Sequence, residues 1–331
     1  MPTDTNIDRR TLLGGAVVAT AASTVATATY AQTDASSLKG KSILITGCSS
    51  GFGFDGALHY ARKGAKVIAS MRNLPRPEAD TLAALAKKEK LDITIIEIDV
   101  TSDDQVATGV AEAERLAGGA LDVLINNAGV GYAGPIELQD MEATKLIFDT
   151  NVYGPHRMAR AVLPSMRKAK KGLIFNISSQ LGRVIAPSAG HYSPTKFALE
   201  AMSEAMAYEL VPHSVEICII QPGGYPTKVW VNRNELAKDL KDRLTAEQAA
   251  AYPALVSRMG TEDGTGRNTD PMDVPRAIAD IIAMPAGTRP LRRAVHPGMK
   301  PQEAINKVSA ETQIAWLGNS PFGPWIKAVH D

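Results

Sequence analysis

Short apolar runs alternate with helical segments along most of this chain, and this alternation limits the fold more than any other feature. The apolar runs have the length and composition of buried strands and occupy residues 41–46, 66–71, 92–100, 121–129, 172–178 and 214–223. Helical patterns fill the intervals, the first ending near residues 63–64 and the others covering 78–90, 103–117, 141–168 and 192–210. Strands that alternate with helices of this length predict βαβ units and a parallel sheet. Right-handed crossovers then give a doubly wound α/β domain.

The chain after the sixth run departs from this pattern. Residues 222–270 are irregular and rich in Pro, Gly and charged side chains, and a long connection at the carboxyl end of a sheet usually carries function. We expect short helices over 235–244 and 245–259, a helix over 271–284 with Pro271 at its start, and a last strand over 291–296. The sequence therefore predicts a single domain over 38–296, with 222–270 as a substrate-side excursion. A tail over 297–331 packs either on this domain or on a second subunit.

Composition excludes several classes of function. The 331 residues are 44% hydrophobic and 21% charged, with a net charge of +1, so there is no electrostatic case for binding nucleic acid or an acidic membrane surface. Cys48 and Cys218 are too far apart in sequence to form a disulfide framework or a metal cluster, and the histidines have no metal-ligand spacing. We expect a small-molecule ligand and no metal.

The first 31 residues have the layout of a bacterial export signal. Arg9 and Arg10 precede an uncharged Ala/Gly/Thr/Val run, and small residues come before Gln32. The paired arginines indicate the twin-arginine class, with cleavage near Ala31 or Ala28. The run is too polar to predict a membrane span. We therefore expect a periplasmic protein; if the arginines are a chance pair in a disordered tail, the protein is cytoplasmic instead.

A glycine-rich loop joins the first strand to the first helix. Gly47, Gly51 and Gly53 follow a GxxxGxG spacing. Glycines permit a tight turn and a close approach of phosphate to the backbone, and the helix N-terminus favours the anion. Such a loop alone can be an ordinary turn, but after the first strand of a βαβ series it predicts dinucleotide binding and a Rossmann-type sheet.

Further motifs follow in a fixed order along the chain. They are TGCSSGFG (46–53), DV (99–100), NNAG (126–129), NVYG (151–154), NISS (176–179), YSPTK (192–196) and PGGYPT (222–227). This combination resembles the short-chain dehydrogenase/reductase family over roughly residues 39–296, and most resembles its branch of hydroxysteroid- and retinol-type dehydrogenases. The resemblance implies hydride transfer between a nicotinamide cofactor and a secondary alcohol, ketone or aldehyde. It also implies a homodimer or homotetramer that pairs through residues 141–168 and 192–210.

Tyr192 and Lys196 are the candidate acid/base pair. An i, i+4 spacing places both side chains on one helix face, although an isolated pair of this kind is usually just a solvated face. The cofactor supplies the hydride, so the protein must handle the proton. A tyrosine has a pKa near 10, and we expect the neighbouring cation of Lys196 to lower it toward working pH. The resemblance implies that Lys196 also binds the nicotinamide ribose.

Ser179 and Asn151 complete the predicted catalytic set. The Ser179 hydroxyl can orient the substrate oxygen toward Tyr192; Ser178 is its rival, and the family spacing favours Ser179. The resemblance implies that Asn151 holds a water that links Lys196 to solvent. The alternative for Asn151 is a helix-interior residue bonded to a neighbouring carbonyl.

The resemblance also assigns the remaining cofactor contacts. The glycine loop contributes Gly47, Ser49, Ser50, Gly51, Phe52 and Gly53. Asn126, Asn127, Ala128 and Gly129 brace the adenosine side, with Asp99 at the adenine amino group and Val100 beside the ring. Pro222, Gly223 and Thr227 close over the nicotinamide, next to Tyr192 and Lys196.

The end of the second strand indicates which cofactor is used. Met71 occupies the position of the acid that binds the ribose in NAD enzymes, and Arg72 follows it. Arginine can pair with a 2′-phosphate, so we expect NADP, with NAD as the alternative; Ser50, where a basic residue often accompanies NADP use, argues the other way.

Two other classes of function, and two interpretations of the excursion, remain open. The chain can be a non-catalytic NADP-binding sensor, or a nucleotide-sugar epimerase or dehydratase. The excursion carries Trp230, Tyr252, Leu255, Val256 and Met259. These side chains can wall an apolar substrate pocket or pack the excursion's own core.

Overall fold

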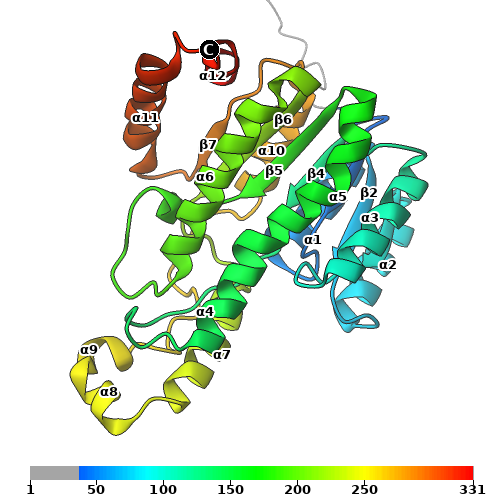
Figure 1. The fold of residues 1–331 in the computed structure, drawn as a ribbon. Helices are drawn as coiled ribbons and strands as arrows, with labels where there is room; N and C mark the ends of the chain where they lie inside the picture. Colours follow the sequence, from blue (N-terminus) through cyan, green and yellow to red (C-terminus); the bar gives the residue numbers. More distant parts are fainter. Residues whose placement is uncertain (1–36, 331) are drawn as a thin grey trace, which may run out of the picture. The chain divides into compact units, whose positions relative to one another are not determined.

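The computed structural model describes residues 37–330, so the predicted export signal lies outside the described residues. Seven parallel strands form one sheet in the order β3-β2-β1-β4-β5-β6-β7 (Figure 1). The strands are β1 (Ser42–Ile45), β2 (Lys66–Met71), β3 (Ile93–Glu97), β4 (Val123–Asn126), β5 (Gly172–Ile177), β6 (Val215–Pro222) and β7 (Arg292–Val295). Strand order reverses between β1 and β4, as in a Rossmann-type doubly wound sheet. The predicted fold class is confirmed, including the last strand.

Helices bury both faces of this sheet. The helices α1 (Gly51–Arg62), α2 (Pro77–Glu89) and α10 (Asp273–Ala283) pack on one face. The helices α3 (Asp103–Ala117), α5 (Gly154–Ala169) and α6 (Tyr192–Leu210) pack on the other. Along β1, Ile43 and Ile45 belong to the first hydrophobic cluster while Leu44 belongs to the second. Because successive strand residues point to opposite faces, a continuous apolar run is what a strand buried on both faces requires.

The excursion forms three helices around a small core that it shares with Tyr132, Leu138 and Ile147. They are α7 (Val229–Asp242), α8 (Ala246–Ala251) and α9 (Pro253–Val256). The first begins six residues before the predicted start at 235, and α10 begins at Asp273 rather than at Pro271. Val256 and Met259 are buried against Ala237 and Leu240, so these two apolar side chains pack the excursion rather than wall a pocket.

The tail folds as two helices that pack on the domain of the same chain. The sequence interpretation gave no helices in this stretch. In the structure, α11 (Gln302–Leu317) lies beside β7 and α12 (Gly323–His330) lies beside α6 (Figure 1). Gln302 and Ile326 are almost fully buried, and His330 contacts the Tyr208 hydroxyl at 2.7 Å. The tail thus follows the first of the two packing alternatives.

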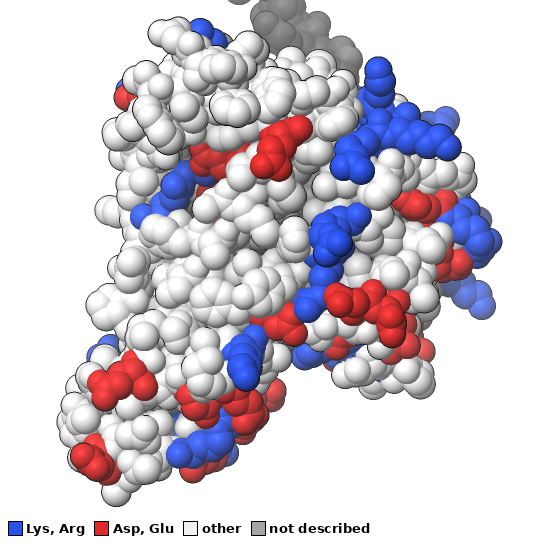
Figure 2. Space-filling view, in the orientation of Figure 1, with Lys and Arg blue, Asp and Glu red and all other residues white. Residues whose placement is uncertain are grey.

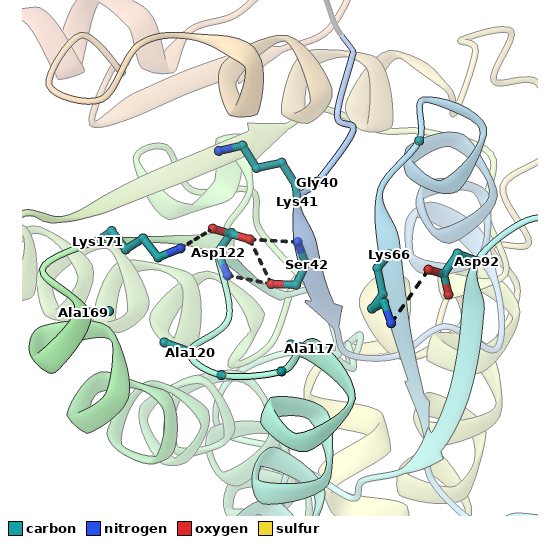
Figure 3. A pocket seen from close by; sticks show the side chains of 13 residues that line it. Gly40, Lys41, Ser42, Lys66, Asp92, Ala117, Ala120, Asp122, Ala169 and Lys171 are labelled. Atoms are coloured by element: carbon teal, nitrogen blue, oxygen red, sulfur yellow. Dashed lines mark hydrogen bonds and ion pairs between the residues drawn. The ribbon is translucent and has the colours of Figure 1, made fainter.

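A cavity of about 490 Å³ lies at the amino ends of β1 and β2 (Figure 3). Three of its polar side chains, Ser42, Asp122 and Lys171, are bonded to one another. The Ser42 amide and hydroxyl donate to Asp122 Oδ2 at 2.9 and 3.0 Å, and Lys171 Nζ donates to Asp122 Oδ1 at 3.1 Å. These bonds tie β1 to the segment before β4. We therefore assign these residues a structural role at the amino edge of the sheet. Ligands of such folds bind at the opposite edge.

Charge is mixed on the surface seen in Figure 2. Lys and Arg side chains are interspersed with Asp and Glu on this face, and they do not gather into a large patch of one sign. Within residues 37–330, no helix has the length and apolar character needed to cross a membrane. The same residues hold no cluster of three or more His, Cys, Asp or Glu side chains placed to bind a metal ion.

Candidate active site

A second cavity, of about 720 Å³, opens at the carboxyl ends of the parallel strands. This is the edge at which open α/β sheets bind their ligands. It is lined by 17 of the residues that the sequence analysis assigned to the site: Gly47, Ser49, Ser50, Gly51, Phe52, Arg72, Asp99, Val100, Asn127, Ala128, Gly129, Ser179, Tyr192, Lys196, Pro222, Gly223 and Thr227. Gly53, Asn126 and Asn151 are not among the lining residues. Asn126 is buried, and its Nδ2 donates to Asn176 Oδ1 at 2.8 Å. Segments far apart in sequence thus meet around one space.

The glycine loop has the geometry of an anion cradle. Gly47 and Gly51 have φ values of +72° and +54°, a backbone conformation that favours glycine. A Cβ on Gly53 would lie 2.4 Å from the Gly47 carbonyl oxygen, so Gly53 serves close packing of α1 on the loop rather than direct contact. Ser50 makes no side-chain cap and the first turn of α1 carries no acid. The backbone N–H groups of the first turn of α1 are thus open to a phosphate. The residues of the loop therefore fit a dinucleotide.

The opposite end of the cavity holds Tyr192 and Lys196 at the start of α6. Lys196 Nζ lies 5.5 Å from the centre of the Tyr192 ring and donates to the Ile177 carbonyl at 2.8 Å. Burial lowers the pKa of Lys196 to about 8, and the negative charge of Glu200 acts against this. The i, i+4 spacing therefore does place both groups on one face. The buried lysine, however, loses its proton more readily than a solvated lysine does.

The pKa of Tyr192 is the point at which the sequence expectation is wrong for the protein without its cofactor. Burial raises this pKa above its usual value, while a hydrogen bond with Ser179 and the charge of Arg233 act against that rise. Ser179 and Arg233, and not Lys196, are the groups that act against the rise in the Tyr192 pKa. Tyr192 therefore holds its proton, which suits a proton donor in the reduction of a carbonyl.

Ser179 and Ser178 differ in their surroundings. Ser179 Oγ accepts from the Leu181 amide at 3.1 Å and is the serine that interacts with the Tyr192 hydroxyl. Ser178 Oγ is buried and has no hydrogen-bond partner among residues 37–330. The structure thus brings Ser179 to the predicted position for orienting a substrate oxygen.

Asn151 lies in a π-helical segment, Asp149–Tyr153, that interrupts the predicted long helix between α4 (Met141–Phe148) and α5. Such segments frequently occur at functional sites. Asn151 Oδ1 accepts from the Val130 amide at 2.9 Å and its Nδ2 donates to the Val130 carbonyl at 2.8 Å. A Cβ on Gly129 would lie 3.3 Å from Asn151 Oδ1 and 3.9 Å from Lys196 Nζ. Asn151 thus holds the loop after β4 in place and lies near Lys196. A water held by Asn151 as a proton relay stays a prediction.

The far end of the cavity fits an adenosine. Asp99 Oδ1 accepts from the amide and hydroxyl of Thr101 at 2.9 and 2.7 Å, which holds the carboxylate at the cavity wall. Arg72 is exposed directly after the buried Met71. Arg76 also lines this end, and its Nη1 donates to the Arg72 carbonyl at 3.3 Å. The sequence analysis missed Arg76, whose only signal is its spacing of four residues from Arg72.

The substrate end contains a group that the sequence analysis also missed. Arg233 Nη1 donates to Glu262 Oε2 at 2.7 Å, and Arg267 pairs with the other oxygen of the same carboxylate. The Arg267 guanidinium lies 3.8 Å from the centre of the Trp230 ring. Trp230 therefore does wall the cavity, although between two arginines rather than in an apolar pocket.

A buried network lies behind Lys196. Glu200, one helical turn further along α6, accepts from Gln221 Nε2 at 2.9 Å and from Arg292 Nε at 2.8 Å. Gln221 Oε1 accepts in turn from Asn306 of α11 at 2.7 Å. The spacing of Glu200 from Lys196 was the available signal. The network joins the tail to the residue that precedes the Pro222 motif.

The sheet, its glycine loop and the cluster of Ser179, Tyr192 and Lys196 define a Rossmann-type oxidoreductase class. The family model of the short chain dehydrogenases matches residues 41–238, and the chain belongs to this family.

Individual proteins show the same relationship. The chain is 33% identical over 276 residues to retinol dehydrogenase 8 of Bos taurus, covering 80% of this chain and 84% of that protein. A short chain dehydrogenase/reductase from Burkholderia phymatum, solved in complex with NAD, superposes with a TM-score of 0.68 at 22% identity over 86% of this chain and 97% of that one. A metagenomic short-chain oxidoreductase in complex with NADP gives a TM-score of 0.62 at 23% identity, over 80% and 100% of the two chains. The two solved structures support the fold, and the bovine relative supports the family.

Proposed function

We propose that this protein is an NAD(P)-dependent oxidoreductase that interconverts a secondary alcohol and a ketone or aldehyde. One observation carries the proposal: Ser179, Tyr192 and Lys196 line one end of a cavity whose other end is the glycine loop. Membership of the short chain dehydrogenase family supports it. So does the name of the bovine relative, a retinol dehydrogenase, and the nicotinamide dinucleotides bound by the two solved neighbours.

Each residue of the cluster has a role that follows from its surroundings. A bound nicotinamide cofactor would supply or accept the hydride, held by the glycine loop, Asp99 and the Pro222 motif. In the reductive direction Tyr192 donates its proton to the substrate oxygen as that oxygen becomes an alkoxide. Ser179 donates a hydrogen bond that orients the same oxygen. Lys196 stabilises the phenolate left on Tyr192, and the reverse direction uses the same groups in reverse.

The test is turnover of NADPH and NADH by the protein from Gln32 onward, over a panel of ketones, aldehydes and quinones. Cofactor oxidation that depends on an added carbonyl compound supports the proposal. Tight NADPH binding without turnover of any compound supports the alternative of a non-catalytic NADP-binding protein. Conversion of a nucleotide sugar with no net change in cofactor supports the epimerase or dehydratase alternative.

We further propose NADP as the preferred cofactor, because β2 ends in Met71 where NAD enzymes have an acid. Arg72 and Arg76 line this end of the cavity, and Arg76 pairs with Glu78 at 2.9 Å. Replacing Arg72 with alanine should raise the Kd for NADPH about tenfold, the size of a lost hydrogen bond to a charged group. The Kd for NADH should change little, since NADH has no 2′-phosphate. Fluorescence titration of both cofactors measures this. If the protein without substitutions binds NADH as tightly as NADPH, the proposed preference for NADP is wrong.

We also propose that residues 1–31 direct export to the periplasm by the twin-arginine route. Arg9 and Arg10 precede the uncharged run, and this route carries folded proteins with their cofactors. Replacing both arginines with lysine should keep the precursor in the cytoplasm, as measured by fractionation of cells expressing the full chain. Normal export of the lysine variant would exclude the twin-arginine route.

A further inference from the structure

Two arginines line the substrate end of the cavity. They are Arg233 of α7 and Arg267 of the excursion, and Glu262 pairs with both of them. We propose that this end binds a carboxylate of the substrate, so that the enzyme acts on oxo acids or hydroxy acids. This inference rests on the proposed function and names the substrate class of the same site.

The aliphatic part of the Arg233 side chain lies near the Tyr192 ring, on the other side of Gly131. A Cβ on Gly131 would lie 3.6 Å from Arg233 Cδ and 3.7 Å from Tyr192 Cδ2, so the two side chains flank the same point. Only 17% of the Arg233 side chain is exposed. Its charge also acts on the Tyr192 phenol and favours a lower pKa there. A substrate whose carbonyl oxygen meets Tyr192 therefore extends past a largely buried guanidinium.

Two hydrogen bonds hold Arg233 in place, and other N–H donors of its guanidinium remain available. Its Nε donates to the Tyr132 carbonyl at 3.3 Å and its Nη1 donates to Glu262. The guanidinium lies 5.3 Å from the centre of the Trp230 ring. Within residues 37–330, Nη2 has no recorded partner, and a guanidinium carries five N–H donors in a rigid fork that matches a carboxylate. The second arginine, Arg267, is stacked on Trp230 as well.

The two arginines share a single carboxylate partner. Arg233 and Arg267 together carry two positive charges against the single charge of Glu262, and the Glu262 side chain is 43% exposed. A substrate carboxylate can therefore replace part of an existing ion pair instead of meeting an uncompensated charge. The acids Glu235 and Asp239 also line the cavity, but both are exposed, where solvent and salt screen them.

The rival explanation is that the Arg233–Glu262–Arg267 group only fastens the excursion to the domain. A fastening role predicts that loss of Arg233 affects every substrate alike. A carboxylate site predicts that the loss depends on substrate charge. The two explanations therefore separate when an acid and a neutral compound of the same skeleton are compared.

The experiment compares aliphatic oxo carboxylates with their methyl esters, using the enzyme with bound NADPH. For the unchanged enzyme, kcat/KM should be higher for the acid than for its ester. In the Arg233→Met variant the acid-to-ester ratio should fall by roughly tenfold or more, mostly through KM for the acid. The Glu262→Gln variant should keep or raise the ratio, because it removes the competing carboxylate. Arg243→Met, which removes the arginine that directly follows α7 and pairs with Asp140 away from the cavity, should leave the ratio as it is.

Two results would overturn the inference: an unchanged enzyme that prefers the esters, or an acid-to-ester ratio that is the same in Arg233→Met as in the unchanged enzyme. Turnover of esters by the unchanged enzyme with no preference for acids would leave the proposed function standing while this inference fails. If no carbonyl compound is turned over, calorimetry of the same acid and ester binding to the NADPH complex still decides. Binding that favours the acid and needs Arg233 supports the site, and equal binding of acid and ester refutes it.

Discussion

Replacing Tyr192 with phenylalanine is expected to lower kcat for carbonyl reduction by about 10²–10⁴-fold, the usual contribution of a positioned proton donor. The phenyl ring keeps the packing at the start of α6, and only the hydroxyl that meets Ser179 is removed. The developing alkoxide must then take its proton from water. The Kd for NADPH should change by less than about threefold, since the lost hydroxyl is uncharged in the free protein. Steady-state kinetics with the best carbonyl substrate, together with NADPH titration, measure both quantities.

The matched control is Tyr132→Phe. Tyr132 is a second phenol that lines the same cavity, and it is nearly fully buried. Loss of its hydroxyl should leave most of the turnover, because it does not interact with Ser179. A Tyr192→Phe variant that keeps more than a tenth of the original kcat would show that another group donates the proton.

The sheet was predictable because its physical requirement is local and repetitive. A strand covered by helices on both faces is apolar at most positions. The runs that became β1 to β6 are of this kind, with only a few polar residues such as Glu216 in β6. The tail was not predictable for the opposite reason. Helices α11 and α12 depend on distant contacts such as Gln302 with Gln221, at 3.3 Å, and on burial of Ile326. Nothing in the spacing of the tail residues encodes those contacts.

The candidate site likewise contains residues that could be predicted from the sequence and residues that could not. Motif order led to Ser179, Tyr192 and Lys196, which the structure brings to one end of one cavity. The direction of the Tyr192 pKa was not accessible, because burial is a property of the folded chain. Arg233 was missed because the excursion has no periodic pattern that singles out one arginine among its many charges. Residues whose role depends on their neighbours in the folded chain thus cannot be identified from sequence spacing alone.

The largest effect on stability is expected at Arg292 of β7. Its side chain is 6% exposed and pairs with Glu200 and Glu204 of α6, which are also largely buried. Burial raises the pKa of Glu204, but contacts with His330, Arg292 and Tyr208 outweigh this and hold the pKa well below its usual range. A carboxyl with a depressed pKa in the folded state stabilises the fold above its unfolded-state pKa of about 4.3, and this contribution is lost as the pH falls through the lower, folded-state value.

Replacing Arg292 with methionine should therefore lower the free energy of unfolding by about 3–5 kcal/mol at pH 7, the typical result of breaking a buried ion pair. Arg183, which lies 3.6 Å from Glu200 and 3.7 Å from Glu204, can take up part of the lost interaction and favours the lower value. Urea unfolding followed by far-UV circular dichroism measures the change. The penalty should shrink toward acid pH, where protonation of Glu204 removes part of the charge that Arg292 neutralises.

The control for this experiment is Arg293→Met, on the next residue of the same strand. Arg293 is exposed, so its loss should change the free energy of unfolding by less than about 0.5 kcal/mol. A loss at Arg292 within about 1 kcal/mol of that control would mean that Arg183 alone neutralises both glutamates, since methionine at position 292 then costs no more than a surface substitution. A loss that stays constant from pH 7 to acid pH would mean that Arg292 contributes through packing of its aliphatic chain, because only a charge interaction depends on ionisation of Glu204.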